Sequence, residues 1–202
     1  ATFTVTVSHS GEKTVASEGL IGVCGPRIEV AAVAADSVET RWERGKESMA
    51  TDGDPATYWH SQYIDANKAK LPGTDNARKW PHWIDLKIGN GSTGYDVCAV
   101  TYTPRAGNGP KASGRAKDVQ IYLAGSRDAL KGQGDNKADV KAQGNPVLAT
   151  TLANTPDTVD IPVAGNGSYL RFRGTSAQAD VAKDLTDVMS VAELGVRIGR
   201  SN

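Results

Sequence analysis

The sequence predicts an all-β protein built as an antiparallel β-sandwich or jelly roll. The first observation is that short segments with alternating apolar and polar residues, or rich in β-branched residues, recur along most of the chain. The second is that clusters of Gly, Pro, Asn, Asp and Ser separate them, as at residues 89–94 and 164–167. Many short strands with turns between them are typical of sandwiches and do not fit a βαβ fold.

The predicted strands are residues 27–33, 83–88, 97–102, 118–123, 158–163, 169–173 and 191–198. Two stretches interrupt them as surface excursions. Residues 64–82 are lysine-rich and contain two prolines, and residues 124–146 are small and polar with one short helical turn near 126–130. Residues 1–27 are predicted to be a leading segment whose strands pack on or precede the sandwich, and residues 28–202 the sandwich itself. The strand-like start of the chain indicates a piece of a longer protein.

Length, charge and cysteine spacing exclude several classes of function. At 202 residues the chain is long enough for one sizeable core. It has 23 basic and 23 acidic residues, so no net field attracts nucleic acid or an anionic membrane. No apolar run approaches the ~18 residues that a membrane span needs. Cys24 and Cys98 match no metal or redox spacing. A single disulfide and two buried free thiols both remain open for them.

An acidic loop at residues 51–63 is the most informative stretch. Asp52, Asp54 and Thr57 bring oxygens to a tight turn, which is what a hard cation such as calcium prefers. A plain turn with side-chain to backbone hydrogen bonds is the alternative. Directly afterwards, His60 and Tyr63 place a polar group beside an aromatic face, the combination that holds a sugar ring. One loop therefore suggests a structural ion next to a binding site.

The order of several motifs resembles the coagulation-factor type C (discoidin) domains, and within them the bacterial family 32 carbohydrate-binding modules. The motifs are residues 52–60, 81–86, 102–105, 114–122, 169–173 and 191–194, and the resemblance covers roughly residues 28–198. It implies a galactose-binding-domain-like jelly roll with one structural calcium and a shallow galactose-type site in the loops at one end. Family members are usually non-catalytic and accompany glycoside hydrolases.

The resemblance also implies individual ligands. The calcium ligands would be Asp52, Asp54, Thr57, Ala192 and Glu193, and the sugar-binding residues His60, Tyr63 and Arg105, with Glu43 a weaker match. Arginine offers two parallel donors to hydroxyls, and a tyrosine ring offers a stacking face. Structural roles are the alternatives: a satisfied loop histidine for His60, a core-rim aromatic for Tyr63, and an ion pair with Glu43 for Arg105.

The sequence departs from the family pattern in two places. Ser113 stands where members often carry an asparagine, and Asn108 is the candidate to supply that amide instead. No aromatic residue occurs in the last loop, residues 176–190. Trp80 and Trp42 are candidates to replace it, and the insertion containing Trp80 is alternatively a block to the site. Trp59 and Trp83 lie in predicted strands and are expected in the core.

Enzymatic readings find no support in the sequence. A glycosidase needs two free carboxylates across a cleft, and the concentrated carboxylates here are the proposed ion ligands. No Gly-x-Ser-x-Gly motif occurs, and the three histidines are not spaced as zinc ligands. The expected function is a secreted or cell-surface bacterial module that binds galactose or N-acetylgalactosamine and targets an attached glycoside hydrolase, without nucleic acid or membrane partners. The alternatives are a spacer or protein-contact module with a degenerate sugar site, and a membrane-surface discoidin domain supported only by residues 68–71.

Overall fold

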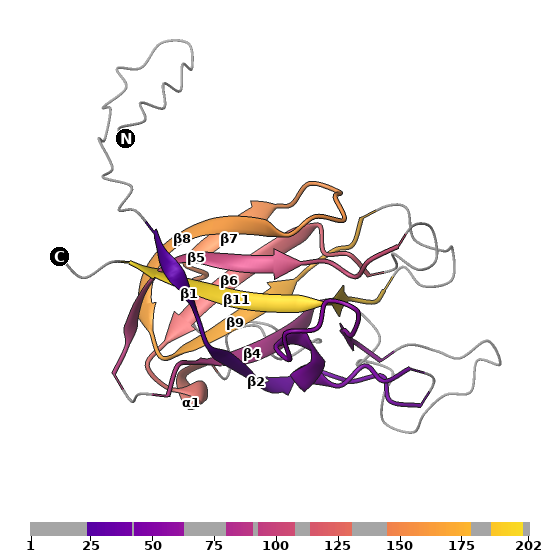
Figure 1. Ribbon diagram of the computed structural model, residues 1–202, viewed down its shortest axis with the longest axis horizontal. Helices are drawn as coiled ribbons and strands as arrows, with labels where there is room; N and C mark the ends of the chain where they lie inside the picture. Colours follow the sequence, from indigo (N-terminus) through magenta and orange to yellow (C-terminus); the bar gives the residue numbers. More distant parts are fainter. Residues whose placement is uncertain are drawn as a thin grey trace, which may run out of the picture.

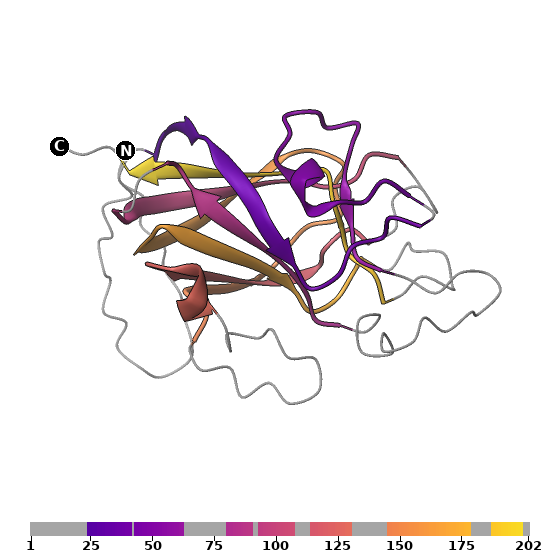
Figure 2. The ribbon, with the colours of Figure 1, turned by 90° about the horizontal axis from the view of Figure 1, so that it is seen from below.

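The computed structural model describes residues 24–41, 43–62, 80–90, 93–107, 114–130, 145–178 and 187–199. Its strands form two antiparallel sheets that face each other, with the chain crossing between them (Figure 1, Figure 2). A third, two-stranded ladder lies among the loops at one end. The predicted all-β antiparallel sandwich is confirmed.

Each sheet combines strands from distant parts of the sequence. The first has the order β1-β11-β5-β8 and consists of β1 (Cys24–Ile28), β5 (Tyr95–Thr103), β8 (Val159–Gly167) and β11 (Glu193–Gly199). The second has the order β2-β4-β9-β6-β7 and consists of β2 (Val30–Ala35), β4 (His82–Ile88), β6 (Asp118–Ala124), β7 (Leu148–Thr151) and β9 (Tyr169–Gly174). The short ladder pairs β3 (Trp59–His60) with β10 (Ser190–Val191), and the helical turns are η1 (Glu47–Ala50) and α1 (Arg127–Leu130).

The core follows from the two-residue period of the strands. Ile84, Leu86 and Ile88 of β4 all point inward and are fully buried. Between the sheets, the ring of Tyr102 stacks on Phe172 with centroids 5.3 Å apart. Each fully buried large apolar side chain contributes about 1.5–3 kcal/mol relative to an exposed one. This continuous apolar layer holds the sheets together and leaves the loops to carry function.

The predicted strand at residues 27–33 is two strands in the structure. β1 pairs with β11 in the first sheet and β2 pairs with β4 in the second, so the chain changes sheets at Glu29. The alternating pattern continues through this crossing, and alternation alone carries no information about the partner strand. β7 was not predicted, because its small and polar residues lack a strand-like apolar pattern. The short helical turn expected near residues 126–130 is confirmed as α1.

The outer face of the second sheet buries charge. Arg171 donates to both carboxylate oxygens of Asp85 at 2.7 and 3.0 Å, and its guanidinium lies 4.0 Å from the centroid of the Trp83 ring. A bidentate pair of this kind is the strong form of a charge-assisted hydrogen bond. Both predicted core tryptophans are buried, but at different places. Trp59 belongs to the core between the sheets, whereas Trp83 lies on the outer face under Arg171.

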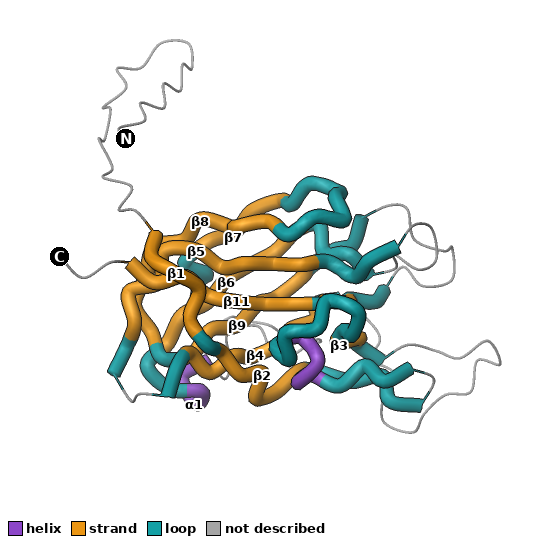
Figure 3. Tube along the Cα trace, viewed as in Figure 1, coloured by secondary structure: helices purple, strands orange, loops and turns teal. Residues whose placement is uncertain are grey.

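The sandwich has two distinct ends. At one end, which we call the loop end, β5 finishes at Thr103, β11 begins at Glu193, and η1 and β3 lie among the connecting loops (Figure 3). At the opposite end, Cys24 lies beside Gly199, so the described chain starts and finishes there. The boundary predicted between residues 27 and 28 falls inside β1. Residues 1–23 of the predicted leading segment lie outside the described residues.

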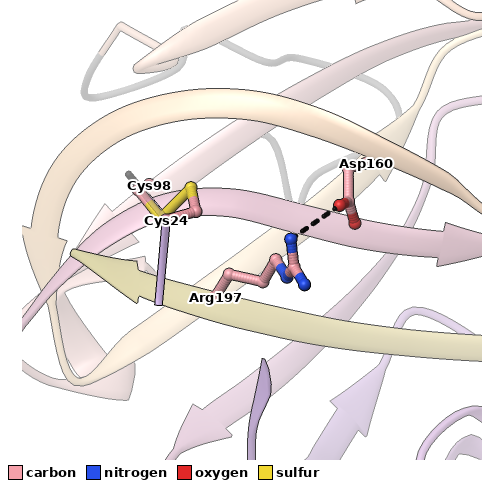
Figure 4. The surroundings of a disulfide bond; sticks show 4 residues. All are labelled: Cys24, Cys98, Asp160 and Arg197. Atoms are coloured by element: carbon pink, nitrogen blue, oxygen red, sulfur yellow. Dashed lines mark hydrogen bonds and ion pairs between the residues drawn. A yellow bond between two sulfur atoms is a disulfide. The ribbon is translucent and has the colours of Figure 1, made fainter. Parts of the chain in front are cut away.

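A disulfide closes the end opposite the loops. Cys24 of β1 and Cys98 of β5 are bonded, with Cα atoms 5.7 Å apart (Figure 4). Of the two states left open by the sequence, the structure therefore has the disulfide. Nearby, Arg197 and Asp160 form an exposed ion pair at 3.2 Å between β11 and β8. The first strand of the described chain is thus tied covalently to the middle of its own sheet.

Candidate functional site

The acidic loop folds by bonding its own side chains to its own backbone. Asp52 accepts from the Asp54 amide at 3.0 Å, and Asp54 accepts from the Ala56 amide at 2.9 Å. Both are the short-range bonds that favour Asp in turns. Gly53 has φ of 83°, a left-handed conformation that glycine adopts without strain. The turn alternative from the sequence is therefore present in the structure, and the remaining oxygens decide whether an ion fits as well.

Oxygens converge on the hydroxyl of Thr57. It lies 2.7 Å from Asp52 Oδ2, 3.0 Å from the Asp54 carbonyl and 3.5 Å from the Met49 carbonyl. A hydroxyl has one proton and can donate to only one of these three acceptors. Asp54 turns its carbonyl, not its hydrogen-bonded carboxylate oxygen, toward Thr57. The Met49 carbonyl was not identified from the sequence, because a backbone oxygen leaves no residue-type signal.

Glu193 joins the acidic loop from the start of β11. Its Oε1 accepts from the Gly53 amide at 2.9 Å, and its Oε2 lies 3.3 Å from Arg27 Nη2. Burial foremost, and the neighbouring Asp52 carboxyl, raise the pKa of Glu193. Burial also pushes the pKa of Asp52 upward, but the hydrogen bonds that Asp52 accepts outweigh this and its pKa is lowered. Two carboxyl groups in contact favour a cation or a shared proton between them.

These residues fit a calcium ion. Within the described ranges, no group of three or more His, Cys, Asp or Glu side chains gathers as a metal site. A site here therefore relies on the two carboxylates together with the Thr57 hydroxyl and backbone carbonyls, and calcium accepts such a mixed oxygen set. Ala192, the fifth predicted ligand, is fully buried between β10 and β11, with its amide bonded to the Thr103 carbonyl at 3.0 Å. Arg27 is a cationic partner of Glu193 that the sequence did not reveal.

A second group, which we call the loop cluster, consists of Glu43, Tyr58, His60 and Arg105. The guanidinium of Arg105 lies 3.9 Å from the centroid of the Tyr58 ring, and its Nη1 lies 3.5 Å from Glu43 Oε2. The Tyr58 hydroxyl is hydrogen-bonded to the Glu43 carboxylate. Burial foremost raises the pKa of Tyr58, with Arg105 opposing and Glu43 adding to the shift, so the hydroxyl stays protonated as a donor.

Glu43 belongs to a tight loop between Glu39 and Gly45, and this loop is hydrogen-bonded to β3. The Glu39 amide donates to the His60 carbonyl at 2.8 Å, and the His60 amide donates to the Gly45 carbonyl at 3.2 Å. A Cβ on Gly45 would lie 2.8 Å from His60 Cβ, so only glycine allows this approach. Glu43 Oε2 is buried and has no hydrogen-bond partner among the described groups. It is thus an acceptor held in place beside a donor, Arg105.

His60 is the most deeply buried member of the loop cluster. It is 1% exposed, and its ring centroid lies 6.4 Å from that of Tyr58. Burial holds the pKa of His60 below its usual range despite an opposing hydrogen bond to Ser61. Its Nδ1 lies 2.6 Å from the Ser61 carbonyl, which can only accept, so the proton is on Nδ1. His60 is therefore a neutral, buried neighbour of Tyr58.

Several predicted sugar-site residues cannot be placed. Tyr63, Asn108, Ser113 and Trp42 lie outside the described residues. The structure brings together Glu43, His60 and Arg105, and it adds Tyr58 as the aromatic partner of Arg105. Tyr58 was missed although it stands two residues before His60, a spacing that puts both side chains on one side of a strand. Trp80 packs its edge on His82, with centroids 4.9 Å apart, and is partly buried against the core.

Curated relatives match this chain over limited parts of their length. A lacto-N-biosidase of Bifidobacterium bifidum is 28% identical over 176 residues, which are 85% of this chain and 14% of that protein. A sialidase of Micromonospora viridifaciens is 33% identical over 98 residues, which are 48% of this chain and 12% of that protein. The chain therefore spans only a small part of either relative. No family model matches it.

Solved structures extend the likeness to the fold. A family 32 carbohydrate-binding module of Clostridium perfringens, in complex with GalNAc-β-1,3-galactose, has a TM-score of 0.56 at 18% identity over 83% of this chain and 94% of that one. The family 32 module of Clostridium perfringens NanJ, in complex with galactose, has a TM-score of 0.55 at 16% identity over 83% and 93%. The chain has the family 32 module fold.

The family 32 fold confirms what the order of the motifs implied about architecture. Within the described part of the chain, no helix is long and apolar enough to cross a membrane. The acidic loop and the loop cluster both lie at the loop end of this fold. β3 connects them, because it directly follows the turn from Asp52 to Thr57 and carries His60.

Proposed function

We propose that this chain is a non-catalytic carbohydrate-binding module that recognises galactose-type glycans and tethers an attached glycoside hydrolase to them. The observation that carries the proposal is the loop cluster at one end of a family 32 fold. Two solved structures with this fold hold galactose or GalNAc-β-1,3-galactose. Both curated relatives are named as glycosidases.

The chemistry of the loop cluster suits a neutral sugar. Each sugar hydroxyl is both donor and acceptor, and the cluster presents one fixed donor and one fixed acceptor side by side. Arg105 supplies the donor from a side chain that is 15% exposed, and Glu43 supplies the acceptor from one that is 22% exposed. Glu43 Oε2 is buried 3.5 Å from Arg105 Nη1, so a ligand hydroxyl or amide would meet the part of the Glu43 carboxylate that remains exposed.

The decisive test is titration calorimetry with galactose and N-acetylgalactosamine, supported by a glycan array. Arg105→Ala should weaken binding by roughly 10- to 150-fold, because a hydrogen bond from a charged donor contributes about 1.5–3 kcal/mol. The matched control is Arg197→Ala, which removes an exposed arginine of β11 that is paired with Asp160 and is not part of the loop cluster. The sugar proposal is wrong if the array is blank or if Arg105→Ala binds like the parent.

The same experiment separates the alternatives. A spacer module with a degenerate site predicts no glycan binding and no liposome binding. A membrane-surface module predicts binding to anionic liposomes through apolar loop tips. In the described part of the chain, the large hydrophobic side chains that are exposed are Val33 and Val147, next to or within sheet strands. Neither forms an apolar tip at the loop end, and residues 68–71, the support for the membrane alternative, lie outside the described residues.

We further propose one structural calcium held by Asp52, Asp54, Thr57, Ala192 and Glu193. The convergence of oxygens on Thr57 and the contact between two carboxyl groups support this assignment. Bound calcium would neutralise the two carboxylates and join the acidic loop to β11. A secreted or cell-surface location in a bacterium is proposed with it, supported by bacterial relatives and by a disulfide, which persists in oxidising compartments.

A further inference from the structure

Arg115 is a buried arginine whose donors reach the base of the loop that carries Arg105. It is 7% exposed. Its Nε lies 3.3 Å from the Arg105 carbonyl and its Nη2 lies 2.6 Å from the Gly107 carbonyl. Its Nη1 lies 3.4 Å from Asn154 Oδ1, in the loop before β8. One guanidinium therefore connects two loops at the loop end.

The backbone around Arg115 is held from several directions. The Gly114 carbonyl accepts from the Ser190 amide at 2.8 Å, and the Arg115 carbonyl accepts from the Gln178 amide at 2.9 Å. Gly114 has φ of 82°, and a Cβ there would lie 2.7 Å from the Ser190 nitrogen. The Ala116 amide donates to the Tyr102 hydroxyl at 3.1 Å. The backbone from which the Arg115 side chain extends is thus held against β5 and β10.

The partners of this guanidinium make its placement unusual. Among the described residues its three acceptors are two carbonyls and an amide oxygen, all neutral. Burying a charge costs free energy, and an apolar side chain that packs well often avoids that cost. What an apolar residue cannot supply is a planar fork of donors with fixed directions. Here the fork points at the two carbonyls that flank Ala106, directly after Arg105.

We propose that Arg115 is a positioning residue for the sugar site, because it fixes the backbone from which Arg105 extends. This inference rests on the proposed function. The Arg105 side chain must lie between the Tyr58 ring and Glu43, and a binding group displaced by more than about 0.5 Å loses much of its contribution. Arg115 touches no ligand itself; it holds the residue that does.

The test compares Arg115→Lys and Arg115→Ala with two controls. Lysine keeps the charge but cannot span both carbonyls, so both variants should weaken galactose binding by about tenfold or more. Asn154→Ala removes the longest of the three contacts, at 3.4 Å, and leaves both carbonyl contacts to the Arg105 loop, so it should change affinity by less than about threefold. Arg197→Ala should change nothing. Adding guanidinium ion to Arg115→Ala should restore part of the affinity, which a purely destabilised fold would not show.

A ligand-free readout keeps this inference separate from the proposed function. The Nε–Hε signal of Arg105 in nitrogen-correlated NMR is shifted by the Tyr58 ring, so it reports the position of the guanidinium. It should move in Arg115→Lys while the Arg197 signal stays in place. An unmoved Arg105 signal overturns the positioning role whatever the affinity. If the parent binds no glycan but the signal moves, the proposed function fails and the positioning role stands.

Discussion

The Arg105 side chain is held by its neighbours Tyr58 and Glu43 in the absence of any ligand. Its guanidinium lies over the Tyr58 ring at 3.9 Å, and Glu43 lies beside it at 3.5 Å. The aromatic face orients the guanidinium without occupying its in-plane donors, since the attraction is to the face of the ring. Tyr58 therefore supports Arg105 and, through its hydroxyl, Glu43. The site is built from neighbours that hold each other as much as from the groups that would meet the sugar.

Substitutions of Tyr58 should separate these two supports. Tyr58→Phe keeps the ring and removes the bond to Glu43, so we expect a small loss of affinity. Tyr58→Leu removes the ring as well, and a cation–π contact of about 0.5–2 kcal/mol corresponds to a further loss of roughly 2- to 30-fold. Calorimetry with galactose checks both. Equal affinities for Leu and the parent would mean that the ring does not support Arg105.

The pH dependence of stability should report on Glu193. Its folded pKa is raised above the usual 4.5, so in ion-free protein its stabilising contribution is complete below that value and is lost as pH rises through the folded pKa. Calcium requires the ionised form, so its stabilising effect should grow over the same range. Melting curves of ion-stripped and calcium-loaded protein between about pH 4 and 7 measure this. Glu193→Gln should remove the divergence; if the parent's two curves stay parallel, Glu193 does not bind the ion.

At the scale of elements, the loop end brings together segments that are far apart in the sequence. The acidic loop follows η1, whereas Glu193 opens β11, and the Gly53 amide joins them at 2.9 Å. β3 pairs with β10 directly beside this contact. Gly195 makes room here as well, since a Cβ on it would overlap the Arg27 side chain that reaches Glu193. An ion at this point would couple segments that no single strand connects.

Removing calcium should loosen this junction. A ligand that binds only the folded state stabilises by mass action, and a 100-fold excess over the dissociation constant contributes about 2.7 kcal/mol. We therefore expect chelator to lower the melting temperature of the parent by several degrees and to leave Glu193→Ala unchanged. Differential scanning calorimetry measures both. A parent curve that chelator does not move would exclude the proposed ion.

The disulfide should affect stability without affecting the site. It closes a loop with a sequence separation of 74 residues. In the chain-entropy model, a bond of this span contributes roughly 4 kcal/mol. Replacing Cys24 and Cys98 together by Ser should lower denaturant stability by that order and leave galactose affinity within twofold, because the bond lies at the end away from the loops. A large loss of affinity would show that the two ends are coupled.

At the scale of the whole molecule, the two ends of the described chain lie at the end of the sandwich opposite the loop end. β11 runs from Glu193 at the loop end to Gly199 beside Cys24, a distance of about 20 Å for a strand of this length. Both ends of the described chain lie away from the loop cluster (Figure 1). A neighbouring domain joined at that end of the sandwich would therefore leave the loop cluster, and with it the proposed sugar site, open.

Avidity should follow from this geometry. A shallow site with few contacts binds a single sugar weakly, because little binding energy remains after the costs of association. Two copies of the module joined end to end should bind a dense galactose surface about 10²- to 10⁴-fold more tightly than one copy. Surface plasmon resonance compares them, and a pair in which one copy carries Arg105→Ala is the control. If that control matches the intact pair, the gain does not come from the sugar sites.

The sequence by itself determined the fold class and the turn chemistry of the acidic loop. Alternation in segments such as residues 83–88 specifies a buried face, and the Asp52–Thr57 turn is local chemistry that the chain carries with it. The tertiary structure alone decided pairings between distant segments. It split residues 27–33 between two sheets, bonded Cys24 to Cys98, and brought Arg27 to Glu193, Tyr58 under Arg105 and Arg115 behind it. The physical reason is that periodicity records which side of a strand is buried, whereas a contact between side chains from different loops depends on the register of every strand between them.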